Sequence, residues 1–181
     1  MTGLLLSLIT FIPLIGAVLV LLPWGRWQGW DQSREEMFIR RLAFLVSLVP
    51  LLLAVILWFA YDKAAGGFQF VTQAPWIPAL GVSYHLGVDG LSVPLIFLTT
   101  LLTTLGLYYS AFTIKTRVRE FFMLFLLLET GMIGVFVALD LVLFYVFWEV
   151  GLVPMYFLIG IWGQEKDRPH YSAIKFFLYT L

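Results

Sequence analysis

Five long apolar runs divide this 181-residue chain, at about residues 4–23, 42–60, 91–112, 120–139 and 141–162. Each is close to the roughly 20 residues that a helix needs to cross a bilayer core of about 30 Å. The chain starts with MTGLLL, which lacks the basic side chain expected at the start of a signal peptide, so the first run is interpreted as an uncleaved span. The pattern predicts an all-α polytopic membrane protein with five complete transmembrane helices.

A sixth apolar run starts at about residue 172 and ends with FFLYTL. Six apolar residues are too few to cross a bilayer. We therefore expect residues 1–181 to form the N-terminal part of a longer membrane domain.

The loop at residues 61–89 differs from the apolar runs. Its segments FQFVTQ and VSYHLGV partly alternate apolar and polar residues, and they flank the connector APWIPALG. This pattern predicts a short β-hairpin packed on the membrane surface. Asp89, directly ahead of the third run, is expected to cap the helix that follows.

The composition of the chain limits the classes of function that it can have. The chain is 61% hydrophobic and 12% charged, whereas soluble domains carry roughly a quarter charged residues. The formal net charge is zero, which gives no electrostatic support for a nucleic-acid partner. There is no cysteine for a disulfide or an Fe–S cluster, and His85 and His170 lie in polar stretches rather than where a membrane haem would be held. We expect no cofactor on this chain.

The basic residues predict an orientation. Ten of the eleven Lys and Arg side chains fall in the first, third and fifth loops, counting Lys175, and only Lys63 lies in the second loop. By the positive-inside rule, the N-terminus and the hairpin loop lie outside and the other three loops lie in the cytoplasm.

Two carboxyl groups interrupt the apolar runs. Glu129 and Glu149 lie near the middle of the fourth and fifth predicted spans, on neighbouring helices. A charged side chain at the bilayer centre costs about 2.5 to 3.5 kcal/mol on insertion scales, so such a group usually faces a protein interior or a wet cavity. A functional role is favoured for Glu149, and for Glu129 both a functional role and a plain hydrogen-bonded helix contact stay open. Asp140, at the junction of the two spans, is interpreted as a helix cap.

The surroundings of Glu149 add to the case. Pro154 has no N–H, so the carbonyl of Val150 loses its helical donor, and we expect a kink beside the carboxyl. No Lys or Arg occurs within the five spans. A basic partner for Glu149 is therefore expected from outside them, with Lys175 the nearest candidate, although such a lysine is more often an anchor at the membrane interface.

Three stretches carry a family resemblance: WIPALGVSYHLGVDGLSVPL, LDLVLFYVFWEVGLVPMYFLIGIWG and YSAIKFFLYT. They closely resemble the M-type antiporter-like subunits of bacterial respiratory complex I, the proton-pumping NADH–quinone oxidoreductase. The mitochondrial counterpart is subunit 4, and the wider family is related to the Mrp-type cation/proton antiporters.

The resemblance implies a fourteen-span protein that couples quinone reduction to proton pumping in the bacterial inner membrane. It matches Glu149 to the key glutamate of the fifth helix, whose lysine partner is on a seventh helix outside this sequence. At Glu129, relatives can carry a neutral polar residue. NADH, FMN, the Fe–S clusters and quinone are expected on other subunits, and the related L and N chains are expected partners. The alternatives are an Mrp-type antiporter subunit without a redox partner and a purely structural role in the membrane.

Overall fold

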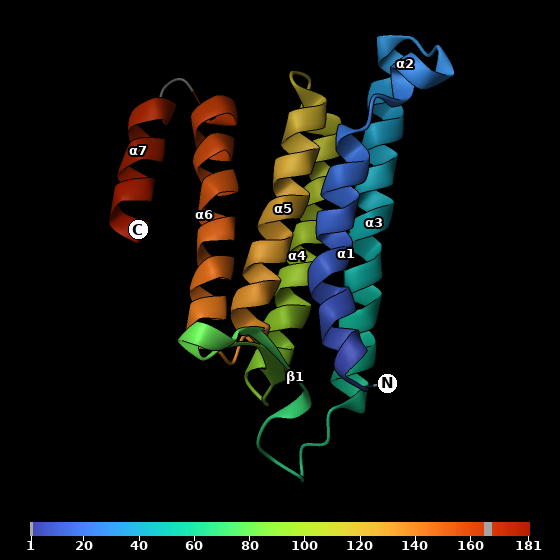
Figure 1. The fold of residues 1–181 in the computed structure, drawn as a ribbon. Coiled ribbons are helices and arrows are strands. Elements are labelled where there is room, and N and C mark those ends of the chain that lie inside the picture. Colours follow the sequence, from blue (N-terminus) through green and yellow to red (C-terminus); the bar gives the residue numbers. More distant parts are fainter. Residues whose placement is uncertain (1, 165–167) are drawn as a thin grey trace.

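The computed structural model describes residues 2–164 and 168–181, which form a helical bundle with a small two-stranded sheet at one end (Figure 1). Five of its helices are long and apolar enough to cross a membrane. They are α1 (Thr2–Leu21), α3 (Gln32–Ala60), α4 (Ser92–Thr113), α5 (Val118–Val137) and α6 (Leu141–Trp162). The prediction of an all-α polytopic membrane protein with five complete spans is confirmed.

The shorter elements join or extend these helices. They are α2 (Trp24–Gln28), α7 (Pro169–Thr180), the strands β1 (Gln69–Ile77) and β2 (Val82–Val88), and a 3₁₀ turn at Pro78–Leu80. Helix α7 corresponds to the expected start of a sixth span, and it packs along α6.

The helix that carries the second predicted span, 42–60, is longer than the span itself. Helix α3 begins at Gln32, ten residues before the apolar run at 42, and the segment 32–41 is not a loop. Its polar first turns are held by pairs four residues apart, from the Gln32 amide to Glu36 and from Glu36 to Arg40. Hydropathy identifies only the apolar part of a helix, so it does not predict the polar turns that extend beyond that part.

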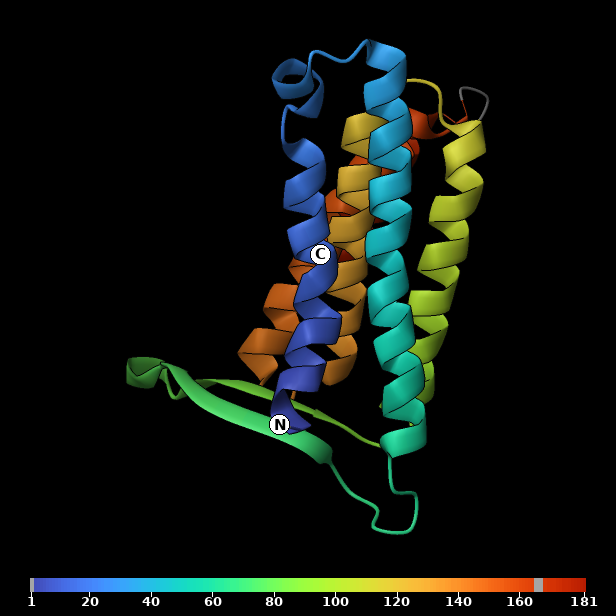
Figure 2. The same ribbon diagram turned by 90° about the vertical axis from the view of Figure 1, so that its right-hand side faces the viewer.

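Helix α5 lies at the centre of the bundle and contacts the other four long helices (Figures 1 and 2). The helices alternate in direction, so that α2, the α4–α5 connection, the end of α6 and the start of α7 lie at one end. The hairpin and the α5–α6 junction lie at the other end. The basic residues expected in the first, third and fifth loops therefore lie at or near one end of the bundle, several of them in helices, and the assignment of this end to the cytoplasm stays a prediction.

The β-hairpin is confirmed, but its connector is shorter than predicted. Ala74 and Pro75 belong to β1 and pair with Tyr84 and Ser83, so only Pro78–Leu80 and Gly81 form the turn. A proline is tolerated here because β1 is an edge strand with one side unpaired. Gly81 adopts φ +68°, a left-handed conformation that glycine reaches without steric cost.

The hairpin is tied to the helices through β2. Ser83 bonds to Asp140, the amide of Leu139 donates to the carbonyl of His85, and the hydroxyls of Tyr84 and Ser7 are 2.8 Å apart. Burial from water raises the pKa of Tyr84 above its ordinary value of 10.0. The sheet thus closes the end of the bundle where α5 turns into α6.

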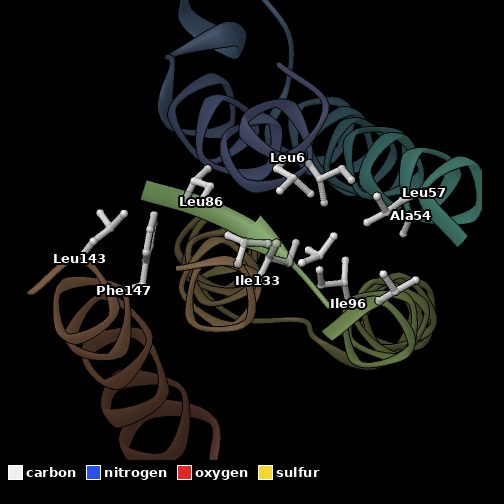
Figure 3. Close-up of a cluster of buried hydrophobic side chains, with 12 residues drawn as sticks. Leu6, Ala54, Leu57, Leu86, Ile96, Ile133, Leu143 and Phe147 are labelled. Carbon is white, nitrogen blue, oxygen red and sulfur yellow. The ribbon is translucent and has the colours of Figure 1, made fainter. Parts of the chain in front are cut away.

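Two apolar clusters fill the bundle, one at each end. Figure 3 shows the cluster beside the hairpin, which gathers buried side chains such as Leu6, Leu57, Ile96 and Ile133 from α1, α3, α4 and α5. The other cluster lies towards α2 and includes Val20, Ala43, Leu107 and Phe122 from the same four helices. A layer between these two clusters contains Glu129.

Candidate functional site

Glu149 lies in the middle of α6 and is partly buried. Its Oε1 atom is buried and has no hydrogen-bond partner among the described residues. Tyr145, one turn earlier on the same helix, lies beside the Glu149 carboxyl. The buried Oε1 atom is left to a partner that the described chain does not supply.

The side chain of Glu149 points away from α5. Phe147 and Gly151, two residues to either side, contact α5 directly, and two residues correspond to about 200° around a helix. Val142, Tyr145 and Val153 share the side of Glu149, and all three are exposed. This stripe of α6 is the surface on which a further element has to sit if Glu149 is to have a basic partner.

Pro154 lies inside α6, buried, and α6 continues through it to Trp162. Because proline has no N–H, the carbonyl of Val150 cannot receive the helical hydrogen bond from position 154. A polar backbone group therefore lies next to Glu149 within the span. The kink that we expect here stays a prediction.

Lys175 does not pair with Glu149. It lies on α7, exposed, with its Nζ atom 5.9 Å from the centre of the Tyr179 ring. Within residues 2–164 and 168–181, no ion pair reaches Glu149 or Glu129. The position of Lys175 is consistent with an interface anchor, and an amine for Glu149 has to come from outside these residues.

Glu129 is more deeply buried than Glu149. It lies in the middle of α5 with no exposed surface, and neither of its carboxyl oxygens has a hydrogen-bond partner in the described part of the chain. Phe122, Leu126, Ile133 and Val137 lie on the same face of α5 and belong to the two apolar clusters. Glu129 thus occupies the level between the clusters.

The other helices place polar groups at the same level. Along each helix, buried hydroxyl side chains fall between the residues of one cluster and those of the other, namely Thr10, Ser47, Thr100, Thr103, Thr104 and Thr130. We call these six residues and Glu129 the polar layer. Most of these hydroxyls donate to a carbonyl of their own helix, and Thr104 donates across to the Ser47 carbonyl at 3.2 Å. A hydroxyl oxygen whose hydrogen is already donated can still accept a hydrogen bond. The hydroxyls of the polar layer can therefore accept a hydrogen bond from a neutral carboxylic acid.

The two carboxyls belong to separate environments. Helices α5 and α6 meet through Gly131 and Gly151 and through Gly134 and Phe147, without a charged side chain at these contacts. Glu129 faces α1, α3 and α4 on one side of this seam, and Glu149 faces outward on the other. The structure therefore places both groups in mid-span on adjacent helices, as the sequence predicts, without bringing them together.

The aspartates at the helix starts lie outside the spans. Asp140 accepts hydrogen bonds from the amides of Val142 and Leu143 at the start of α6 and from the amide of Ser83 in β2. The amide of Ser83 is the main reason why the pKa of Asp140 lies below its ordinary value of 3.8. Asp89 accepts from the amide and hydroxyl of Ser92, which lowers its pKa in the same way. Both carboxylates bond to backbone amides at the starts of their helices.

Comparison with known proteins adds to this geometry. Residues 138–181, which include Glu149 and Pro154, match the family described as NADH:quinone oxidoreductase/Mrp antiporter, transmembrane. Over 97% of its length, the chain is 48% identical to NADH-quinone oxidoreductase subunit M of Rhodobacter capsulatus, of which it covers 33%. It is 41% identical over 97% of its length to NAD(P)H-quinone oxidoreductase chain 4 2 of Thermosynechococcus vestitus, of which it covers 31%.

The chain belongs to the NADH:quinone oxidoreductase/Mrp antiporter family. The resemblance predicted from the sequence motifs is thereby confirmed. The chain spans about a third of the length of the curated relatives it matches.

Chains in two solved respiratory complexes have the same fold. A chain of respiratory complex I from Thermus thermophilus with bound NADH superposes with a TM-score of 0.74 at 29% identity, over 97% of this chain and 33% of that one. A chain of the membrane-bound sulfane sulfur reductase, an archaeal respiratory membrane complex, gives a TM-score of 0.75 over 96% of this chain and 33% of that one. At 19% identity, this second likeness shows the fold alone.

Sequence reasoning missed two features of this family member. The polar layer was not predicted, although threonines 100, 103 and 104 recur at helical spacing within one apolar run. The ion pair between Arg119 and Glu35, which joins the starts of α5 and α3, was also missed. The two residues are 84 positions apart, and no local pattern connects them.

Proposed function

We propose that the chain is the N-terminal part of a proton-translocating membrane-arm subunit of NADH–quinone oxidoreductase, of the M type. The observation that carries the proposal is Glu149, a mid-span carboxyl with one buried oxygen that has no partner among the described residues. The similarity to subunit M of Rhodobacter capsulatus supports the assignment to this complex.

In this proposal Glu149 takes up and releases a proton as an amine approaches and retreats. A buried carboxyl without a partner favours its neutral form, and a cation placed close to it favours the ionised form. The exposed stripe of α6 beside Glu149 is where an element from outside the described residues would bring the amine. The energy would come from quinone reduction elsewhere in the complex.

The remaining assignments follow from the same proposal. NADH, FMN, Fe–S clusters and quinone would bind to other subunits, in line with a sequence that has no cysteine. The partners would be other membrane-arm subunits, including the related L and N chains. The location would be a bacterial inner membrane, with the Arg-rich end of the bundle in the cytoplasm.

The test replaces Glu149 with Gln in the complete subunit within the assembled complex. The amide keeps the size of the side chain but cannot exchange a proton, so proton pumping per NADH oxidised should fall, measured in inverted membrane vesicles. Glu120→Gln is the matched control, because Glu120 is partly exposed and pairs with Arg117 at the start of α5. Equal pumping by the Glu149 variant and the control would leave a structural role as the explanation of Glu149.

The same experiment addresses the Mrp-type alternative, which the description of the family includes. An antiporter subunit would move ions in response to an imposed gradient, without NADH oxidation. The antiporter assignment would replace ours if two results were obtained together. The wild type would show no NADH-driven pumping, and the Glu149 variant would lose cation-driven proton exchange.

A further inference from the structure

A groove lies between α3 and α4 at the end of the bundle that carries α2, and it is separate from both carboxyls. Its volume is about 510 Å³. Figure 2 shows the two helices side by side along their length. The apolar walls of the groove are formed by Met37, Phe44, Tyr108, Ala111 and Phe112. Its polar mouth is formed by Ser33, Glu36, Arg40 and Arg41.

Two nitrogens of the Arg40 guanidinium are hydrogen-bonded in this groove, and its Nε–H is not. Its two terminal nitrogens donate to the carbonyls of Ala111 and Ile114, at 2.5 and 3.0 Å, which joins α3 to the end of α4. Its Nε atom is buried and has no partner among the described residues. A buried N–H without an acceptor is costly, so an acceptor from a bound molecule would be favourable at this position.

Arg41 provides a second cation beside it. It is exposed and makes no hydrogen bond or ion pair within the described part of the chain. The acidic residue of the groove, Glu36, is already compensated, because it lies 3.6 Å from Arg40 and accepts a 2.9 Å hydrogen bond from Gln32. The mouth of the groove therefore carries a net positive charge.

The walls have the chemistry of a lipid-facing surface. Tyr108 and Phe112 are exposed aromatic residues whose rings meet edge to face at 5.3 Å, and Phe44 packs against Tyr108 at 5.7 Å. At the same end of the bundle, Trp24 and Trp30 pack against Phe38, and Trp27 packs against Trp24. Tryptophan and tyrosine are enriched where membrane helices pass the headgroups, which places the arginines at the level of lipid phosphates.

We propose that this groove binds an anionic phospholipid. Arg41 and the free Nε–H of Arg40 would hold the phosphate, and the first part of an acyl chain would lie along Phe44, Tyr108 and Phe112. Basic side chains near the membrane surface attract anionic lipids, and the aromatic walls add a fit for one chain. This inference does not depend on the proton-carrying role of Glu149.

The test compares two arginine variants of the complete subunit in the assembled complex. The complex is purified, placed in nanodiscs of phosphatidylglycerol and phosphatidylcholine, and its retained lipids are measured by native mass spectrometry. Arg41→Ala should weaken phosphatidylglycerol retention about fivefold, the effect of one basic residue near a charged membrane. Arg34→Ala, the control, removes the same charge from a fully exposed pair with Asp31 outside the groove and should leave retention unchanged.

A second variant and a crosslink test whether the molecule bound in the groove is a lipid. Ala111→Phe fills the groove without changing charge, and it should also reduce retention. A benzophenone side chain at Phe112 should crosslink to lipid. Equal retention by the Arg41 and Arg34 variants, equal preference for phosphatidylcholine, or a crosslink to protein instead of lipid would each overturn the proposal.

Discussion

Gly131 of α5 packs directly against Gly151 of α6. A Cβ atom on Gly131 would lie 2.6 Å from the backbone nitrogen of Gly151 and 2.7 Å from its Cα. Close approach of two helices at small residues is typical of membrane proteins, where packing rather than the hydrophobic effect holds helices together. This contact sets the rotation of α6, and with it the outward direction of Glu149.

Gly131→Ala should therefore separate α5 from α6. The atoms in the way are backbone, which cannot turn aside, so we expect a loss of about 1 to 3 kcal/mol in stability. Gly160→Ala is the control, because its Cβ would meet Ala173 at 3.5 Å, an ordinary contact. Both changes raise helix propensity by the same amount, so the melting temperature of the solubilised complex should fall for Gly131→Ala alone. Equal melting temperatures would show that the two helices do not depend on this contact.

Glu129→Met should leave stability unchanged or raise it. The substitution removes two buried oxygens that have no partner in the described chain and keeps a side chain of similar size. Thr104→Val, at the same level, removes a hydrogen bond between helices and should cost about 1 kcal/mol. Both are measured as melting temperatures of the complex. A large loss from Glu129→Met would mean that bound water or another segment satisfies the carboxyl.

The hairpin contact at Asp140 should depend on pH. The pKa of Asp140 is lower in the folded protein than its ordinary value of 3.8, mainly because the amide of Ser83 donates to the ionised carboxylate. A lowered carboxyl pKa stabilises the fold above the ordinary value, and that contribution is lost as pH falls from about 3.8 through the lower folded pKa.

Amide hydrogen exchange at Ser83 measures this effect. The wild type should be better protected than Asp140→Asn above pH 3.8, and the difference should disappear as the pH falls below it. Asp89→Asn serves as the control, since Asp89 caps α4 and does not bond to Ser83. A difference between wild type and Asp140→Asn that persists at low pH would rule out the ionised carboxylate as the cause.

How far the sequence predicts this molecule can be seen from single residues. The spans and the hairpin are predictable because lipid requires about twenty apolar residues and a hairpin requires alternation, and both signals are local. The mid-span positions of Glu129 and Glu149 follow from the same count. Their directions do not, because helix rotation depends on contacts such as that of Gly131 with Gly151, which are distant in sequence. The polar layer was not predicted for the same reason, because its residues come from four helices and only the packing of these helices brings them to one level.

The last prediction concerns the ion pair between Arg119 and Glu35. Glu35 also accepts a 2.8 Å hydrogen bond from the amide of Gly25, so one carboxylate holds both the start of α5 and the helix α2. Arg119→Ala removes one of these links, and we expect a loss of about 1 kcal/mol, typical of a well-placed ion pair near the surface. Glu35→Ala removes both links and should destabilise the complex more.

Two measurements distinguish these variants. Melting temperatures should fall in the order Arg119→Ala and then Glu35→Ala, with the exposed control Arg34→Ala unchanged. Limited proteolysis within α2 should quicken in Glu35→Ala more than in Arg119→Ala, because only the former releases the amide of Gly25. If both variants are cleaved equally fast, the hydrogen bond to Gly25 does not hold α2 in place, and the anchoring of α2 rests on the contacts of Trp24 and Trp30 with Phe38 instead.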